Sequence, residues 1–169
     1  MERRDQADPL VILVDLEKRV RSVLTWEELQ FVFVNETHSL IPYRQAILFS
    51  SNNVPLAFSG VAAAEANAPF IQWLKKNLSP LIRETADASR LSPTSLSSSA
   101  ASDWSSWLPQ FVFLQPLVTP KGERLGCLLL ARDNEWTDDD LEILDILAGT
   151  YGHAWDAITL PRNDWSLRR

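Results

Sequence analysis

The chain has 169 residues, of which 46% are hydrophobic and 22% charged, so its length and composition are those of a single globular domain. A net charge of −6 at pH 7 argues against a protein that coats nucleic acid, because the phosphate backbone binds basic surfaces. One cysteine rules out an internal disulfide, and two distant histidines disfavour a zinc site, so neither a metal nor a cofactor is expected.

The N-terminal part of the chain is predicted to be helical. Residues 1–9 are mostly charged or polar and are expected to be disordered. Between residues 10 and 24 the apolar side chains recur every three or four positions, which predicts an amphipathic helix. Thr25 followed by Glu28 forms a capping box, so a second helix is expected over residues 26–40.

The middle of the chain is predicted to contain a hairpin, a helix and a loop. Residues 44–50 and 54–59 are rich in strand-forming residues and flank an Asn-Asn turn. A helix capped by Asn67 is expected next. Nine of the eighteen residues in the segment 89–106 are serine, so this segment is interpreted as a mobile loop within the domain.

The last part of the chain is predicted to form two strands and a long helix. Residues 110–118 and 124–132 are expected to be strands, and the second is apolar on both faces, which is typical of a central strand. The helix over residues 138–159 is apolar around most of its girth and needs cover from other helices or from a second subunit. A basic tail or linker is expected over residues 161–169. This order of elements predicts one α+β domain, residues 10–160, with a mostly antiparallel sheet.

The same region carries a family resemblance. The strand Leu125–Leu130 (LGCLLL), a short polar stretch, Trp136-Thr137 and the acidic run Asp138–Asp140 resemble the GAF-domain pattern. In that pattern, a strand reading G-x-L-x-L leads through an aromatic residue and Ser or Thr into an acidic helix start. The order of the earlier elements agrees, so the resemblance covers residues 10–159. It implies a sensory domain of α/β/α layers, in which helices from both chain ends pack on one face of the sheet and often pair with a second subunit. Loops and a short helix on the other face would enclose a ligand pocket.

The known ligands of that family are not indicated by this sequence. No Asn-Lys pair is present where the cyclic-nucleotide-binding members have one, and Leu141 stands where they have Glu. The single cysteine lies in a strand rather than in a loop suited to bilin attachment. The members that reduce methionine sulfoxide need more than one cysteine. The resemblance therefore implies an unidentified small-molecule ligand, or none.

Two sets of residues are candidates for the implied roles. Trp104 and Trp107 are large aromatic residues in a polar segment, and they are expected either to close over a pocket as a lid or to anchor the loop. The candidate pocket residues are Phe70, Trp73, Leu74, Trp104 and Trp107. The candidate dimer interface consists of Leu13, Leu16, Val20, Leu144, Leu147, Tyr151 and Trp155.

No arrangement of acid, base and nucleophile points to catalysis. Cys127, in an apolar strand, is interpreted as inert packing. His38 is interpreted as a surface residue near a helix end, and His153 as a packed helix residue. The three aspartates at 138–140 are interpreted as favourable charges at a helix start rather than as metal ligands.

The sequence therefore predicts a non-catalytic sensory or regulatory domain that binds a small molecule, forms a homodimer, or does both. The alternative is a structural protein-interaction module with a filled pocket and no ligand. No apolar run is long enough for a signal-peptide core or a membrane span, which predicts a cytoplasmic location. The Trp- and Arg-bearing end, residues 161–169, is interpreted first as a frayed tail. The alternative is a tether to a membrane segment beyond Arg169, by analogy with some bacterial secretion proteins.

Overall fold

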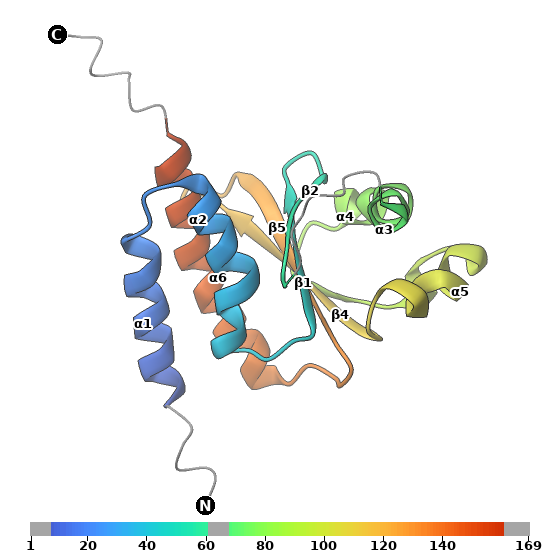
Figure 1. Ribbon diagram of the computed structural model, residues 1–169, viewed down its shortest axis with the longest axis horizontal. Helices are drawn as coiled ribbons and strands as arrows, with labels where there is room; N and C mark the ends of the chain where they lie inside the picture. Colours follow the sequence, from blue (N-terminus) through green and yellow to red (C-terminus); the bar gives the residue numbers. More distant parts are fainter. Residues whose placement is uncertain (1–7, 61–67, 161–169) are drawn as a thin grey trace, which may run out of the picture.

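In the computed structural model, which describes residues 8–60 and 68–160, helices cover both faces of a five-stranded sheet (Figure 1). The strands are β1 (Gln45–Ser50), β2 (Pro55–Phe58), β3 (Ser89–Leu91), β4 (Phe111–Val118) and β5 (Arg124–Arg132). They stand in the order β2-β1-β5-β4-β3, and every neighbouring pair is antiparallel. The predicted α+β class is therefore confirmed, with β5 as the central strand.

Helices from both ends of the described chain cover one face of the sheet, as the resemblance implied. They are α1 (Pro9–Arg21), α2 (Trp26–Phe31) with its π extension η2 (Val32–Glu36) and the 3-10 turn η3 (Thr37–Ser39), and α6 (Asp138–Thr159). α6 packs on β4 and β5, η2 packs on β1, and α1 lies against α6 as the outermost helix (Figure 1). α1 and α6 run parallel to each other, and α2 runs in the opposite direction.

The side chains predicted to form a dimer interface lie inside this layer of helices. Leu16, Val20, Leu144, Leu147, Tyr151 and Trp155 are buried within the single chain, and Leu13 packs against the same core. The Tyr151 hydroxyl, for example, shares a hydrogen bond of 2.7 Å with the Thr37 hydroxyl. The prediction that the six buried residues face a second subunit is wrong, because helical periodicity identifies the buried side chains but not the chain that covers them. Leu13 is only partly buried, and its contact with a second subunit stays a prediction.

Two glycines allow α6 to approach the sheet closely. A Cβ atom at Gly152 would overlap the carbonyl oxygen of Val118 in β4. A Cβ atom at Gly126 in β5 would lie 2.6 Å from the indole ring of Trp155 and would also overlap a carbonyl oxygen of β1. The helix therefore packs directly on backbone atoms at both positions, which a larger residue would prevent.

Shorter helices cover the second face of the sheet. They are α3 (Pro69–Trp73), the π turn η4 (Leu74–Leu78), α4 (Ser79–Glu84), the 3-10 turn η5 (Pro93–Ser95) and α5 (Ser98–Trp107). α3, η4 and α4 follow one another without a break, so the helix continues past Pro80. Proline has no N–H to donate and disrupts regular α-helical hydrogen bonding, and the π turn immediately before it accommodates this disruption.

The serine-rich segment 89–106 is not the loop that its composition predicts. It contains β3, which pairs with β4, and most of α5. The helix is capped by Ser97, whose hydroxyl accepts a hydrogen bond of 3.4 Å from the N–H of Ala100. Ala100 and Trp104, four residues apart on one side of the helix, are buried. Packing of these two side chains overrides the preference of serine for turns and caps.

The predictions for the two ends of the chain fall mainly outside the described residues. Of segment 1–9, only Asp8 and Pro9 are described. The predicted disorder is wrong for these two residues, because Asp8 caps α1 and Pro9 is the first residue of that helix. The basic tail 161–169 lies entirely outside them. Of the helices that the structure describes, none combines the length and the hydrophobicity that crossing a membrane requires.

Candidate ligand-binding site

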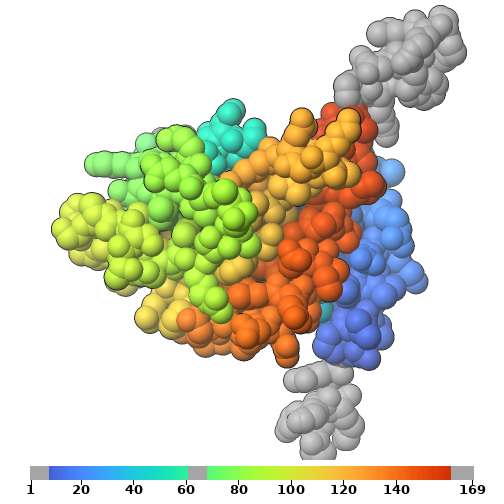
Figure 2. Space-filling model, turned by 180° about the vertical axis from the view of Figure 1, so that it is seen from behind, coloured from blue at the N-terminus to red at the C-terminus, as the bar shows by residue number. Residues whose placement is uncertain are grey.

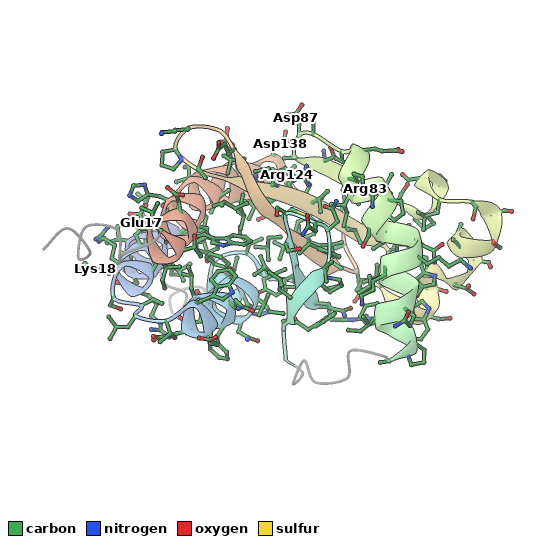
Figure 3. All side chains as sticks on the ribbon, turned by 90° about the horizontal axis from the view of Figure 1, so that it is seen from above. Glu17, Lys18, Arg83, Asp87, Arg124 and Asp138 are labelled. Carbon is green, nitrogen blue, oxygen red and sulfur yellow. The ribbon has the colours of Figure 1, made fainter. Side chains whose placement is uncertain are left out.

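The second face of the sheet has a hydrophobic core distinct from the one under α6. Successive residues of a strand point to opposite faces, so alternate residues of the strands reach this side. The sheet contributes Ile47, Phe49, Leu91, Val112, Leu114, Cys127, Leu129 and Ala131. The helices contribute Trp73, Leu74, Leu78, Ile82 and Trp104, and Leu108 follows the end of α5. Figure 3, seen from above, shows side chains on both sides of the sheet.

The five side chains predicted to form a pocket meet in this second core. Phe70, Trp73 and Leu74 come from α3 and the first residue of η4, and Trp104 and Trp107 come from α5. The rings of Phe70 and Trp107 are stacked, with centroids 5.4 Å apart and an interplanar angle of 13°. The rings of Trp73 and Trp104 meet edge to face at 6.3 Å. These four aromatic residues, together with Leu74, are called the aromatic cluster below.

The aromatic cluster is buried at its base and partly open at its rim. Trp104 is only 1% exposed, and its Nε1–H donates a hydrogen bond of 2.9 Å to the carbonyl oxygen of Pro109. Phe70 and Trp107 are half-buried. Trp73 is 8% exposed, and its Nε1–H has no hydrogen-bond partner within the described part of the chain. A buried N–H without a partner costs free energy, so Trp73 holds a donor suited to an acceptor atom.

The two tryptophans of α5 have different positions. Trp104 anchors the helix in the core, whereas Trp107 lies at the rim against Phe70. A residue that the sequence did not single out, Phe58 of β2, lies beside this rim with its ring centroid 6.0 Å from that of Phe70. No local pattern marks Phe58, because β2 and α3 come together only in the folded chain.

The single thiol lies in the same core and fits the packing interpretation. Cys127 is fully buried in β5. Burial raises the pKa of its thiol to about 11, and the neighbouring Arg124 guanidinium opposes that shift. Arg124, labelled in Figure 3, donates a hydrogen bond of 2.6 Å from Nη1 to the carbonyl oxygen of Thr85. This contact ties the start of β5 to the residue that follows α4.

We expect Cys127 to react at least about 100-fold more slowly with a thiol reagent in the folded protein than in denaturant at pH 8. The reason is that the thiolate is the reactive species, and a pKa near 11 leaves little of it at that pH. The absorbance change of an aromatic disulfide reagent measures both rates. Equal rates in the two states would show that the thiol is accessible and would contradict the packing interpretation.

The other polar candidates lie apart from the aromatic cluster. His38 is exposed, as predicted. His153 is also exposed, on α6, so its interpretation as a packed residue is wrong. Asp140 completes a capping box with Thr137 and forms a 2.6 Å salt bridge with Arg132. Within residues 8–60 and 68–160, no three His, Cys, Asp or Glu side chains are placed to hold a metal ion.

Several solved structures resemble this arrangement. A GAF domain/HD domain protein from Geobacter sulfurreducens is 17% identical with a TM-score of 0.57, over 92% of this chain and 97% of that one. The phycocyanobilin-bound GAF domain from a cyanobacterial phytochrome is 13% identical with a TM-score of 0.59, over 92% and 99% of the two chains. The N-acylhomoserine lactone-dependent LuxR family transcription factor CepR2 from Burkholderia cenocepacia is 14% identical with a TM-score of 0.55, over 94% and 99%.

No family model matches the sequence, and no curated protein matches it significantly. At identities of 13% to 17%, the likeness concerns the fold and not the ligand or the output. In this chain, that fold is a five-stranded antiparallel sheet with helices from both ends of the described chain on one face and shorter helices on the other. This chain therefore has the fold of a GAF domain, as its C-terminal motif predicted.

Proposed function

We propose that this chain is a non-catalytic sensory or regulatory domain that binds a small molecule at the aromatic cluster. One observation carries the proposal: the half-buried, stacked pair of Phe70 and Trp107 lies in the same cluster as Trp73, a buried indole whose N–H has no partner among the described residues. Aromatic walls with a single free donor suit a flat, largely apolar molecule that carries a hydrogen-bond acceptor. Two of the similar structures, one bilin-bound and one lactone-dependent, support ligand binding by this fold.

A thermal-shift screen with a dye readout tests the proposal. A flat acceptor-bearing compound at about 100 times its Kd stabilises a protein by about 2.7 kcal/mol, which raises the melting temperature by roughly 5–10 °C for a domain of this size. We expect this shift for the wild type and its loss in Trp107→Leu, which removes the stacked ring at the rim. The matched control is Phe31→Leu, because Phe31 is an aromatic residue 52% exposed on α2, on the other side of the sheet.

The alternative function is a protein-interaction module with a filled pocket. The observation that favours it is the tight base of the aromatic cluster, where Leu74 is 0% and Trp104 1% exposed. If no compound in a broad screen shifts the melting temperature, the small-molecule proposal fails and the interaction module is the better description. If Trp107→Leu and Phe31→Leu retain the same shift, a ligand binds, but not at the aromatic cluster.

Homodimerisation and a cytoplasmic location are further parts of the proposal, as is the absence of catalysis. The fold shared with a phytochrome domain and a lactone-dependent transcription factor supports a regulatory role. A membrane tether beyond Arg169 rests on the composition of residues 161–169 alone. The coding sequence beyond Arg169 tests it: a long apolar segment supports the tether, and a stop codon contradicts it.

A further inference from the structure

A groove of about 770 Å³ lies between α1, α2 and α6, and it is called the α1–α6 groove below. Figure 2 shows α1 and α6 next to each other, on the side of the molecule opposite α3–α5. The aliphatic residues that line the groove include Val23, Leu24, Ile146, Ala154, Ala157 and Ile158. Its charged or polar lining residues are Glu17, Arg21, Thr150 and His153, so both signs of charge are present. Leu24 is 86% and Ile146 53% exposed, and such grouped aliphatic residues indicate a contact surface.

The α1–α6 groove extends to the end of α6, where the described chain leaves the helix. Ile158 lines the groove, and α6 ends one residue later, at Thr159. Leu160 has an extended backbone, with φ −64° and ψ 141°, as expected of a residue that precedes a proline. Proline also favours the second position of a tight turn, so the sequence of residues 160–163 suits a turn that brings the chain back along α6.

The sequence after residue 163 alternates polar and apolar residues. Asp164, Ser166 and Arg168 alternate with Trp165 and Leu167. Alternation with a period of two is typical of an extended segment with one apolar side. A large indole and a leucine on that side need an apolar surface to cover them, and the aliphatic wall of the α1–α6 groove is the nearest one to the end of α6 along the helix.

The length of this segment matches the length of the groove. An α-helix rises 1.5 Å for each residue, so Ile146 lies about 18 Å from Ile158 along α6. An extended chain advances about 3.3 Å for each residue, so the six steps from residue 163 to residue 169 span about 20 Å. After a tight turn, the segment is therefore long enough to follow the groove from one end to the other.

We propose that residues 163–169 dock in the α1–α6 groove of the same chain, as an extended segment that runs antiparallel to α6. The proposal goes beyond the proposed function and does not depend on a ligand at the aromatic cluster. It identifies the groove as a binding site for a segment of this chain, which shields the exposed aliphatic residues of the helices from other partners.

The two spacings set the register of the docked segment. With residue 163 level with Leu160, Trp165 lies at the height of Ala154 and Ala157, whose small side chains leave room for an indole. Leu167 then lies near Gly149, which also lines the groove. A Cβ atom at Gly149 would meet no atom within 4 Å, so the surface there is open.

Charge supports the same direction of the segment. A second hollow along the start of α6 shares Ile146 with the groove and is lined by three acidic residues, of which Asp145 is the nearest to Ile146 in the sequence. Asp145 forms no salt bridge with another described residue. The register places Arg169 at the height of Ile146, where its guanidinium can pair with the Asp145 carboxylate. The apolar residues of the segment thus meet the apolar part of the groove, and its last cation meets the acidic end.

Disulfide mapping in the 169-residue chain tests the docking. In oxidised glutathione, Gly149→Cys combined with Leu167→Cys should form an intramolecular disulfide at least about 10-fold faster than the control pair Lys121→Cys and Leu167→Cys, because docking raises the local concentration of the two thiols. Lys121 is exposed in the β4–β5 turn, which also lies near the second half of α6 because Val118 contacts Gly152. Peptide mass mapping identifies the linked residues.

Two results of this experiment contradict the proposal. Equal rates for the two pairs overturn the docking. A covalent dimer in place of the intramolecular disulfide shows that the groove takes the segment of a second copy, which overturns docking within one chain. Ligand binding at the aromatic cluster is judged separately, by the thermal-shift screen, so either result leaves the proposed function standing.

Further substitutions in the Gly149→Cys and Leu167→Cys chain test the register. Trp165→Ala should lower the rate of disulfide formation about 10-fold, because a buried tryptophan is the strongest anchor of such a contact. The matched control is Ser166→Ala, the next residue, which faces outward in the alternating pattern and should leave the rate unchanged. Arg169→Glu should lower the rate about 3-fold, because it adds a like charge at the acidic end of the groove. Equal rates for Trp165→Ala and Ser166→Ala overturn the proposed register.

Discussion

Replacing Gly152 with alanine is expected to lower the free energy of unfolding by about 3 kcal/mol. The added methyl group would overlap the carbonyl oxygen of Val118. α6 cannot move aside freely, because Leu147, Tyr151 and Trp155 on the same helix are buried and close-packed. Relieving the overlap would lift the helix from β4 and leave gaps around these side chains, which forfeits their contacts. Urea denaturation followed by circular dichroism measures the change.

Gly149→Ala is the matched control, one turn earlier on the same helix. A Cβ atom there would meet no atom within 4 Å. Alanine has a better helix propensity than glycine, so this variant should gain up to about 1 kcal/mol. The two substitutions are chemically identical and should act with opposite sign. If both variants lose stability equally, the close approach of α6 to β4 at Gly152 is not the cause.

Replacing Arg132 with methionine is expected to lower the free energy of unfolding by about 3–5 kcal/mol. The Arg132 side chain is only 7% exposed and forms a salt bridge of 2.6 Å from Nη2 to Asp140 Oδ2. It also donates to the backbone carbonyl oxygens of Pro42, Asn134 and Glu135, at 3.1, 3.1 and 2.8 Å. Its guanidinium carbon lies 4.0 Å from the centroid of the Trp136 ring. Methionine fills a similar volume but leaves one carboxylate and three carbonyl groups without their donor.

Arg44→Met is the control for this prediction. Arg44 forms a salt bridge of 2.7 Å with Asp133, but the two side chains are 65% and 63% exposed. Exposed pairs of this kind contribute at most about 1 kcal/mol, so the same substitution there should have little effect on the urea midpoint. If both variants lose similar amounts of unfolding free energy, the large effect at Arg132 does not come from the burial of its side chain.

The elements whose signals are local could be predicted from the sequence. The helix over residues 138–159 agrees with α6 because Thr137 caps it and acidic residues occupy its first turn. The strand over residues 124–132 agrees with β5 because its continuous apolar run requires cover on both faces. In contrast, α5 could not be predicted from its serines, because the buried partners of Trp104 lie far away in the sequence.

The candidate site shows the same division between local and distant information. That Trp104 and Trp107 lie with the aromatic residues of α3 could be predicted from the sequence, because large rings in polar surroundings need a place to pack. It could not identify Phe58, whose position depends on β2 lying beside α3. It also assigned the apolar stripe of α6 to a partner subunit, because periodicity cannot distinguish α1 of the same chain from a helix of another.

The length of α6 has a mechanical consequence. The helix has 22 residues and is therefore about 33 Å long, at 1.5 Å for each residue. Its first turn is fixed to the end of β5 by the Arg132–Asp140 salt bridge, and about 18 Å further along Gly152 lies directly on the backbone of β4. A helix held at two points so far apart keeps its direction relative to the sheet. A shift of these strands would therefore move the whole helix, including its end at the last described residues.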